Sequence, residues 1–124
     1  MSEKISPYEA RRALRDIATY YGVEAQLRQL MEESGELIQA CNKYLRIEDG
    51  GQIVVMPGMD AAECRKHAID SIIEEIADVD IMIKQAIYLL DISYEDLLKV
   101  ELAKIKRTHD RMKKQQEMEG ERYD

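Results

Sequence analysis

The sequence predicts an all-α protein, a four-helix bundle-type unit folded as one domain over residues 1–124. Two observations predict this class. Charged residues make up 35% of the chain and runs of β-branched residues are scarce, which is typical of long helices with one side in solvent. Apolar residues also recur at helical spacing between Gly and Pro residues that divide the chain into four segments. Because the chain has no Trp and no Phe, its core must be built from aliphatic residues, Met and Tyr.

The first half of the chain predicts two helices. Ser6-Pro7-Tyr8-Glu9 reads as a capping box with Pro at the first helical position, so a helix should begin here. It should stop near Gly22, because glycine commonly ends helices. The second helix is predicted from about residue 23 to 46, with apolar residues at helical spacing: Val23, Leu27, Leu30, Leu37, Cys41 and Tyr44.

The second half predicts one loop and two further helices. Residues 48–59 contain Gly-Gly and Pro-Gly pairs that exclude a helix, although residues 53–56 could form a short extended piece. Asp60 should cap a third helix that runs to about Leu90, and Ser93 should open a fourth. The last residues, 113–124, are polar on all sides and should fray.

Composition narrows the function classes. A net charge of −7 argues against a nucleic-acid polymer as partner, because such polymers are bound through excess Lys and Arg. No stretch approaches the roughly 20 apolar residues that cross a bilayer, and no apolar signal region opens the chain. Cys41 and Cys64 have no metal or redox spacing and are expected to be reduced. We therefore expect a cytoplasmic protein without a membrane partner.

The second and third predicted helices repeat one acidic pattern at an offset of about 42 residues. Residues 30–37 align with 72–79, so that Glu33 matches Glu75 and Glu36 matches Asp78. Each pair is spaced (i, i+3) and lies on the same flank of the apolar stripe of its helix. If the two helices pack antiparallel, four carboxylates should share one cleft.

Two interpretations of these acidic clusters stay open. Glu is a good helix former, so both could be solvated faces of a non-catalytic acidic helical dimer that acts as an interaction module. Like charges at this spacing disfavour a helix, however, and a divalent cation would offset their repulsion. All-oxygen ligands suit Mg²⁺, with Mn²⁺ as a possible substitute. Zinc would require His or Cys, and the Glu-x-x-His of di-iron bundles does not occur.

The spacing Glu32-Glu33-x-x-Glu36, followed downstream by Glu75-x-x-Asp78, resembles the signature of the MazG-like all-α nucleoside triphosphate pyrophosphohydrolases. Tyr21-Gly22 with Gln26, residues 36–40 and residues 74–79 also look like this group, and the resemblance covers roughly residues 20–110. It implies a four-helix unit completed by dimerisation or tetramerisation, with the active site near the subunit interface.

The resemblance also implies the chemistry and the residues that perform it. A nucleoside triphosphate and water would give the monophosphate and pyrophosphate by attack of a metal-activated water at the α-phosphorus. Glu33, Glu36, Glu75 and Asp78 would hold Mg²⁺. The catalytic residues would be Glu32 and Glu33, with Glu32 orienting or deprotonating the attacking water. A sister activity, hydrolysis of a phosphoribosyl-linked nucleotide, stays open.

Other residues are candidates for substrate binding. Lys104 and Arg107, on the fourth predicted helix, could grip the triphosphate, or could simply complement the helix dipole. Lys43 could touch substrate or be solvated surface, and Gln26 could contact base or sugar. Asp80 falls on the apolar face of the third helix, where we expect a structural or interface salt bridge more than metal ligation.

Overall fold

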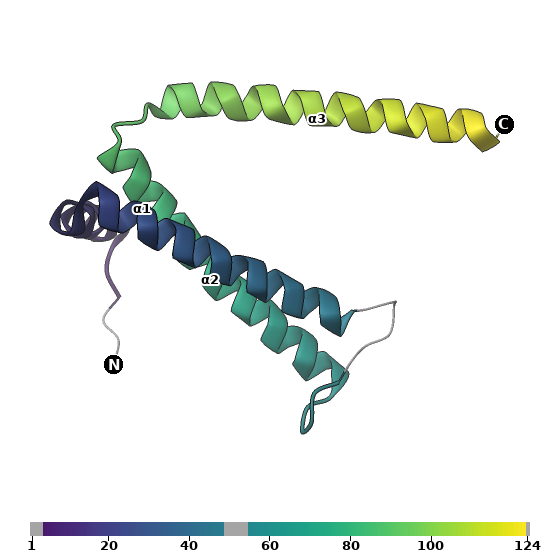
Figure 1. The fold of residues 1–124 in the computed structure, drawn as a ribbon, viewed down its shortest axis with the longest axis horizontal. Helices are drawn as coiled ribbons and strands as arrows, with labels where there is room; N and C mark the ends of the chain where they lie inside the picture. Colours follow the sequence, from purple (N-terminus) through teal and green to yellow (C-terminus); the bar gives the residue numbers. More distant parts are fainter. Residues whose placement is uncertain (1–3, 49–54, 124) are drawn as a thin grey trace. The chain divides into compact units, whose positions relative to one another are not determined.

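The computed structural model describes residues 4–48 and 55–123. Helix α1 spans Pro7–Ile47, α2 spans Ala61–Leu89 and α3 spans Tyr94–Tyr123 (Figure 1). Within these described ranges there is no strand, so the predicted all-α class is confirmed. The two helices predicted for the first half of the chain are the two arms of α1.

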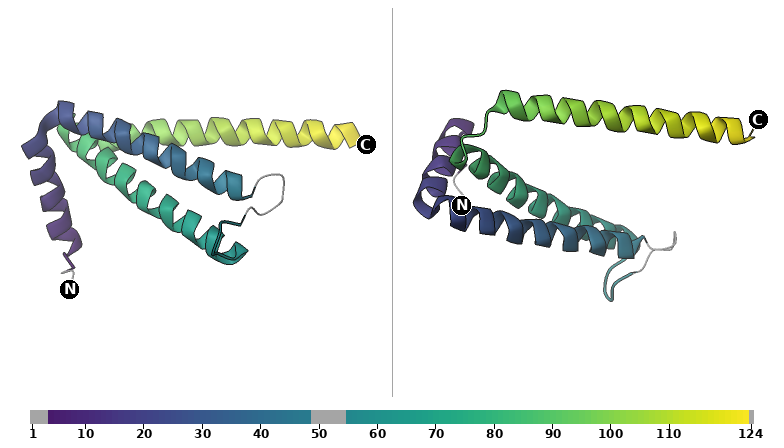
Figure 2. Two further views of the ribbon diagram at one scale, coloured as in Figure 1. Left: turned by 60° about the horizontal axis from the view of Figure 1, so that its bottom comes forward. Right: turned by 45° about the horizontal axis from the view of Figure 1, so that its top comes forward.

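Helix α1 bends at Gly22, where the backbone leaves the helical region with φ 87° and ψ 173°. Only glycine adopts this combination readily, because it has no Cβ to clash. Figure 2 shows the N-terminal arm turning away from the longer arm at this point. The predicted start is also present, since the Ser6 hydroxyl accepts a hydrogen bond from the Glu9 backbone N–H at 3.1 Å. Both the predicted cap and the predicted break are confirmed.

The longer arm of α1 packs antiparallel against α2 (Figures 1 and 2). At the end of the pair where α1 stops and α2 begins, a buried cluster is formed by Ile47, Cys64 and Ala68. Beside it, Arg65 forms an ion pair with Glu48 at 2.5 Å. At the other end the Arg15 guanidinium lies over the Tyr88 ring, 5.4 Å from its centre. Contacts between α1 and α2 therefore occur at both ends of the helix pair, as a buried cluster with an ion pair at one end and a cation–π contact at the other.

The predicted loop at residues 48–59 contains a turn just before α2. Met59 donates a backbone hydrogen bond to Met56 at 3.1 Å, and Gly58 between them has φ 83°. This is the position of a Pro-Gly turn that requires a positive φ. Residues 53 and 54 of the expected extended piece lie outside the described residues. The Asp60 carboxylate then accepts from the Glu63 backbone N–H at 2.8 Å, which confirms the predicted cap of α2.

The burial differs from the predicted apolar stripe at two positions. Val23 and Cys41 are exposed, because the buried face of the longer arm turns through Gln26, Ala40 and Ile47 instead. Small side chains and the buried amides of Gln26 and Gln85 therefore replace part of the expected aliphatic core. Both cysteines are free thiols.

Helix α3 belongs to a second compact unit that begins at Asp91. Its first turn is capped by the Ser93 hydroxyl, which accepts from the Asp96 backbone N–H at 3.3 Å. The helix continues through Tyr123, across residues for which we expect fraying. Fraying concerns helix–coil exchange and stays a prediction, as does the single domain. Among the described helices, none combines the length and apolarity that a membrane span needs.

Candidate metal centre

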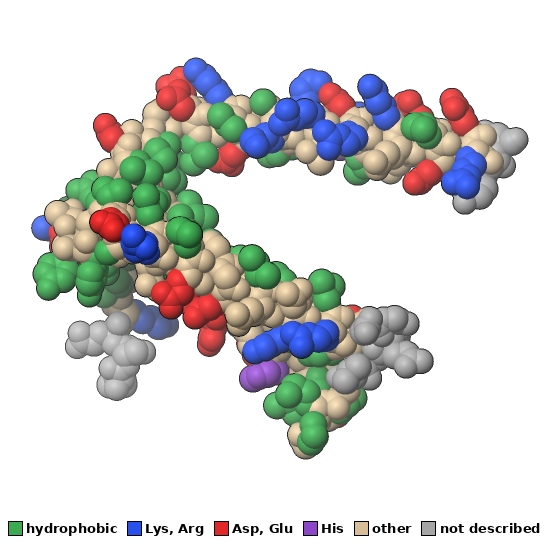
Figure 3. Space-filling model, in the orientation of Figure 1, with side chains coloured by type: hydrophobic (Ala, Val, Ile, Leu, Met, Phe, Trp, Pro, Cys, Tyr) green, Lys and Arg blue, Asp and Glu red, His purple; other side chains and the backbone are tan. Residues whose placement is uncertain are grey.

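Four carboxylates meet midway along the α1–α2 pair. Glu33 and Glu36 come from α1, Glu75 and Asp78 from α2, and one carboxylate oxygen of each lies within 4.8 Å of the others. Figure 3 shows acidic side chains gathered on this face of the helix pair. The antiparallel packing brings together the two (i, i+3) pairs that repeat along the sequence. The predicted geometry is present, and its role as a metal site stays a prediction.

Two oxygens of this cluster lack the partners that buried polar atoms need. Glu33 Oε2 and Glu75 Oε2 are buried, and neither has a hydrogen-bond partner within the described part of the chain. The other Glu33 oxygen accepts from the Gln29 side-chain amide at 2.8 Å, one helical turn earlier. An orphaned buried carboxylate oxygen is costly, and a bound cation is one way to satisfy it.

No ion pair among the described residues involves any of the four carboxylates, although six pairs form elsewhere. Their mutual repulsion is visible at Glu36. The pKa of the Glu36 carboxyl is raised, first by the hydrogen bond that it can donate to Glu33 when it is protonated and then by the negative charges of Glu33 and Glu75. The cluster thus favours taking up positive charge, either a proton or a metal ion.

The donor set and the spacing suit a small hard cation. Two oxygens bound to one Mg²⁺ lie at most about 4.2 Å apart, twice the metal–oxygen distance. The observed limit of 4.8 Å is slightly larger, so small side-chain rotations would bring the four oxygens onto one ion or onto two neighbouring ions. Because the group contains neither His nor Cys, zinc fits it poorly.

The other candidates on the helix pair differ in their exposure. Glu32 is exposed and adjoins the cluster in sequence, and Lys43 is exposed further along α1. Gln26 is buried, and its side-chain amide donates to the Gln85 side-chain oxygen at 2.6 Å. Its predicted contact with base or sugar stays a prediction, as do the roles of Glu32 and Lys43.

Two side chains that the structure connects to this region, Gln29 and Gln85, were not predicted from the sequence. Gln29 stands four residues before Glu33, a spacing at which helical side chains meet, so the contact between the two side chains could have been predicted from the sequence. Gln85 interrupts the apolar end of α2, and only the packed helices reveal that it faces Gln26.

Asp80 forms an ion pair with Lys84 at 2.7 Å, one turn further along α2. Both side chains are about half exposed, at 54% and 55%. The expected salt bridge is present within one helix, and Asp80 is not a member of the carboxylate group.

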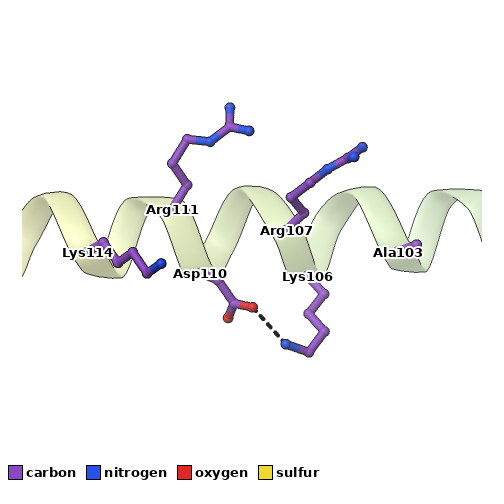
Figure 4. Close-up of a pocket in the computed structure, with 6 residues that line it drawn as sticks. All are labelled: Ala103, Lys106, Arg107, Asp110, Arg111 and Lys114. Atoms are coloured by element: carbon purple, nitrogen blue, oxygen red, sulfur yellow. Dashed lines mark hydrogen bonds and ion pairs between the residues drawn. The ribbon is translucent and has the colours of Figure 1, made fainter.

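Lys104 and Arg107 lie on α3, where they are exposed. The exposed surface of this helix around Arg107 also carries Ala103, Lys106, Asp110, Arg111 and Lys114 (Figure 4). Lys106 and Asp110 form an ion pair at 2.7 Å, which raises the pKa of Lys106 and lowers the pKa of Asp110. The surface offers guanidinium and ammonium groups suited to phosphate oxygens.

Comparison with known proteins gives no relative for this chain: no family model, curated protein or solved structure matches it.

Proposed function

We propose that this chain is a magnesium-dependent nucleoside triphosphate pyrophosphohydrolase, which converts a ribo- or deoxyribonucleoside triphosphate and water to the monophosphate and pyrophosphate. One observation carries the proposal: Glu33, Glu36, Glu75 and Asp78 converge without a cationic side chain, and two of their oxygens are buried without partners. The resemblance of the two acidic motifs to MazG-like enzymes supports the choice of reaction.

In this proposal the four carboxylates hold Mg²⁺, with Mn²⁺ as a possible substitute. The bound ion would neutralise phosphate charge, activate water and stabilise the leaving pyrophosphate. Gln29 keeps the Glu33 carboxylate turned so that its second oxygen is free for the ion. Glu32 accepts the proton that the water loses as its oxygen bonds to the α-phosphorus, and the bond from that phosphorus to the bridging oxygen breaks.

Cationic and amide side chains would bind the substrate. Lys104 and Arg107 would hold the triphosphate, Lys43 would contact it, and Gln26 remains a candidate for base or sugar. Each of the first three can donate charge-assisted hydrogen bonds to phosphate oxygens.

We also propose that the active form is a homodimer or homotetramer that completes a four-helix bundle. The support is apolar surface on the helix pair. On α2, four isoleucines spaced as on one helical stripe are 42–58% exposed: Ile69, Ile73, Ile76 and Ile83. Asp80, paired with Lys84, lies in the same stripe. Apolar surface of this extent favours association, and a second copy of the chain would cover it.

The test is a substrate panel with purified protein and Mg²⁺, in which released pyrophosphate is measured. The panel contains the common NTPs and dNTPs and one phosphoribosyl-linked nucleotide. We expect pyrophosphate from at least one triphosphate, and none after chelation by EDTA. Pyrophosphate from the phosphoribosyl compound alone would indicate the sister activity.

The non-catalytic alternative makes different predictions in the same preparation. An acidic interaction module would release no pyrophosphate from any compound while a control enzyme does. Its melting temperature would also be indifferent to Mg²⁺. That combination would contradict both the proposed reaction and the proposed metal.

A further inference from the structure

Two glutamine side chains are buried in the contact between α1 and α2. Gln26 is 7% exposed and Gln85 is 2% exposed, and they are the buried polar residues of the described chain. The Gln26 amide donates to the Gln85 carbonyl oxygen at 2.6 Å. Buried amides are costly unless paired, and apolar side chains of similar volume would cost less at these positions. The pair therefore calls for a role beyond adding stability.

The position of this pair along the helices suggests that role. Gln26 lies seven residues before Glu33 on α1, and Gln85 lies seven residues after Asp78 on α2. Since the helices are antiparallel, the glutamines face each other two helical turns from the point where the carboxylates meet. One alignment of the two helices therefore produces both the glutamine pair and the convergence of the four carboxylates.

A shift of one helix along the other would break both contacts together. Moving α2 by one residue displaces its side chains by about 1.5 Å along the axis and turns them by about 100°. The apolar contacts resist such a shift weakly, because most of the fully buried apolar residues of the two helices are small, such as Ala40, Ala68 and Ala86. A hydrogen bond between two buried amides is directional, and a slipped alignment would leave both amides unsatisfied.

We propose that Gln26 and Gln85 are positioning residues, whose buried hydrogen bond selects the alignment of α1 against α2 in which the four carboxylates converge. The alignment part stands on geometry alone, whereas its consequence for a metal rests on the proposed function. A single buried polar pair is known to fix the register of helices in coiled coils.

The test compares wild type, Gln85→Leu and the double variant Gln26→Leu/Gln85→Leu, with Met82→Leu as a control. Met82 is buried one turn from Gln85, and its replacement conserves volume. Alignment is read without metal, from the distance between spin labels on Cys41 and on an introduced His67→Cys. Cys41 and His67 are exposed, while the buried Cys64 is protected from the label. Dilution with unlabelled protein suppresses distances between chains.

We expect one narrow distance in wild type and in Met82→Leu, and a broadened or second distance in the double variant. Gln85→Leu should melt below wild type, because it leaves the Gln26 amide buried without a partner. The double variant should recover the melting temperature but not the narrow distance. A role in stability alone predicts that both recover together, and a narrow wild-type distance in the double variant would overturn the proposal.

Mn²⁺ affinity, measured by calorimetry, then tests the consequence for the site. We expect the double variant to bind Mn²⁺ at least about tenfold more weakly than wild type, a loss of the size seen when residues supporting metal ligands are removed. If wild type itself binds no Mn²⁺, the metal site fails, and the distances still decide the role of the glutamines. Equal Mn²⁺ affinity in wild type and the double variant would overturn the inference and leave the proposed function standing.

Discussion

The protein carries two charged clusters of opposite sign that are built in different ways. The acidic cluster draws Glu33 and Glu36 from α1 and Glu75 and Asp78 from α2, so its members are brought together by packing. The basic surface of α3 comes from one helix, where Arg107, Arg111 and Lys114 recur at spacings of three and four residues. The first cluster exists only when two helices hold their alignment, whereas the second exists wherever the helix forms.

The two clusters also differ in whether their charged groups are paired with groups of opposite charge. On α3 the carboxylate of Asp110 is paired with Lys106, so opposite charges neutralise each other locally. In the acidic cluster the neighbours of Glu36 are carboxylates, which raise its pKa instead of lowering it. A self-neutralised helix surface needs no ligand to be stable. A cluster of like charge that packing enforces is relieved by positive charge, either a proton or the metal ion that we propose.

The largest effect is expected when one carboxylate of the acidic cluster loses its charge. Glu36→Gln and Asp78→Asn should each reduce pyrophosphate release by about 100-fold or more, because removing a direct ligand should cost at least as much as removing a residue that supports one. Folding should be preserved, since each change also relieves repulsion. Initial rates at saturating Mg²⁺ and circular dichroism spectra provide the two measurements.

Glu74→Gln is the matched control for these variants. Glu74 is an exposed neighbour of Glu75 on the same helix and is not a member of the converging group. Its replacement changes the net charge equally and should leave the rate within about twofold of wild type. Equal losses in Glu74→Gln and Glu36→Gln would show that net charge matters and convergence does not.

A second effect should separate the bend of α1 from the regular part of the same helix by stability. Gly22→Ala forces a Cβ into a backbone region that almost only glycine occupies, and should lower the free energy of unfolding by about 1–3 kcal/mol. Gly35, also in α1, lies within regular helix and has open space around its Cα, so Gly35→Ala should stabilise by roughly 0.5–1 kcal/mol. Urea denaturation of both variants measures the difference, and equal stabilities would contradict the strained kink.

A third and smaller effect concerns the cationic side chains of α3. Lys104→Ala and Arg107→Ala should raise the KM for the triphosphate by about tenfold each with little change in kcat, because each removes a charge-assisted contact worth roughly 1.5 kcal/mol. Lys113→Ala, on the same helix, is the control and should change neither constant. If all three variants behave alike, the basic surface acts only through its overall field or merely complements the helix dipole.

The sequence was most informative where its signals were local. Three helix starts were predicted from their capping residues Ser6, Asp60 and Ser93, and the break in α1 was predicted from Gly22. Caps and positive φ angles depend only on a few residues nearby in the sequence. The convergence of the carboxylates was also predictable, since an internal repeat makes two helix faces equivalent. Gln85 was missed because its partner lies 59 residues away, and no local rule couples two amides at that separation. The exposure of Val23 was missed for the same reason, because only the packed helices show that the buried face of the longer arm runs through Gln26, Ala40 and Ile47.

The smallest effect should appear in the pH dependence of stability without metal, and its sign should differ between the two clusters. A carboxyl whose pKa is raised by folding binds its proton more tightly in the folded state, so Glu36 lowers stability as pH rises through the window above its ordinary pKa of 4.5. In EDTA, Glu36→Gln should therefore exceed wild type in melting temperature by more at about pH 7.5 than at about pH 5.

Asp110, whose pKa is lowered, should behave oppositely: its stabilising pair with Lys106 is fully present above its ordinary pKa of 3.8 and is lost only as pH falls below it. Asp110→Asn should thus melt below wild type, by an amount that does not grow as pH rises over the same range. A Glu36→Gln difference that likewise does not grow with pH, and that saturating Mg²⁺ does not change, would mean that the acidic cluster is solvated like any other helix surface.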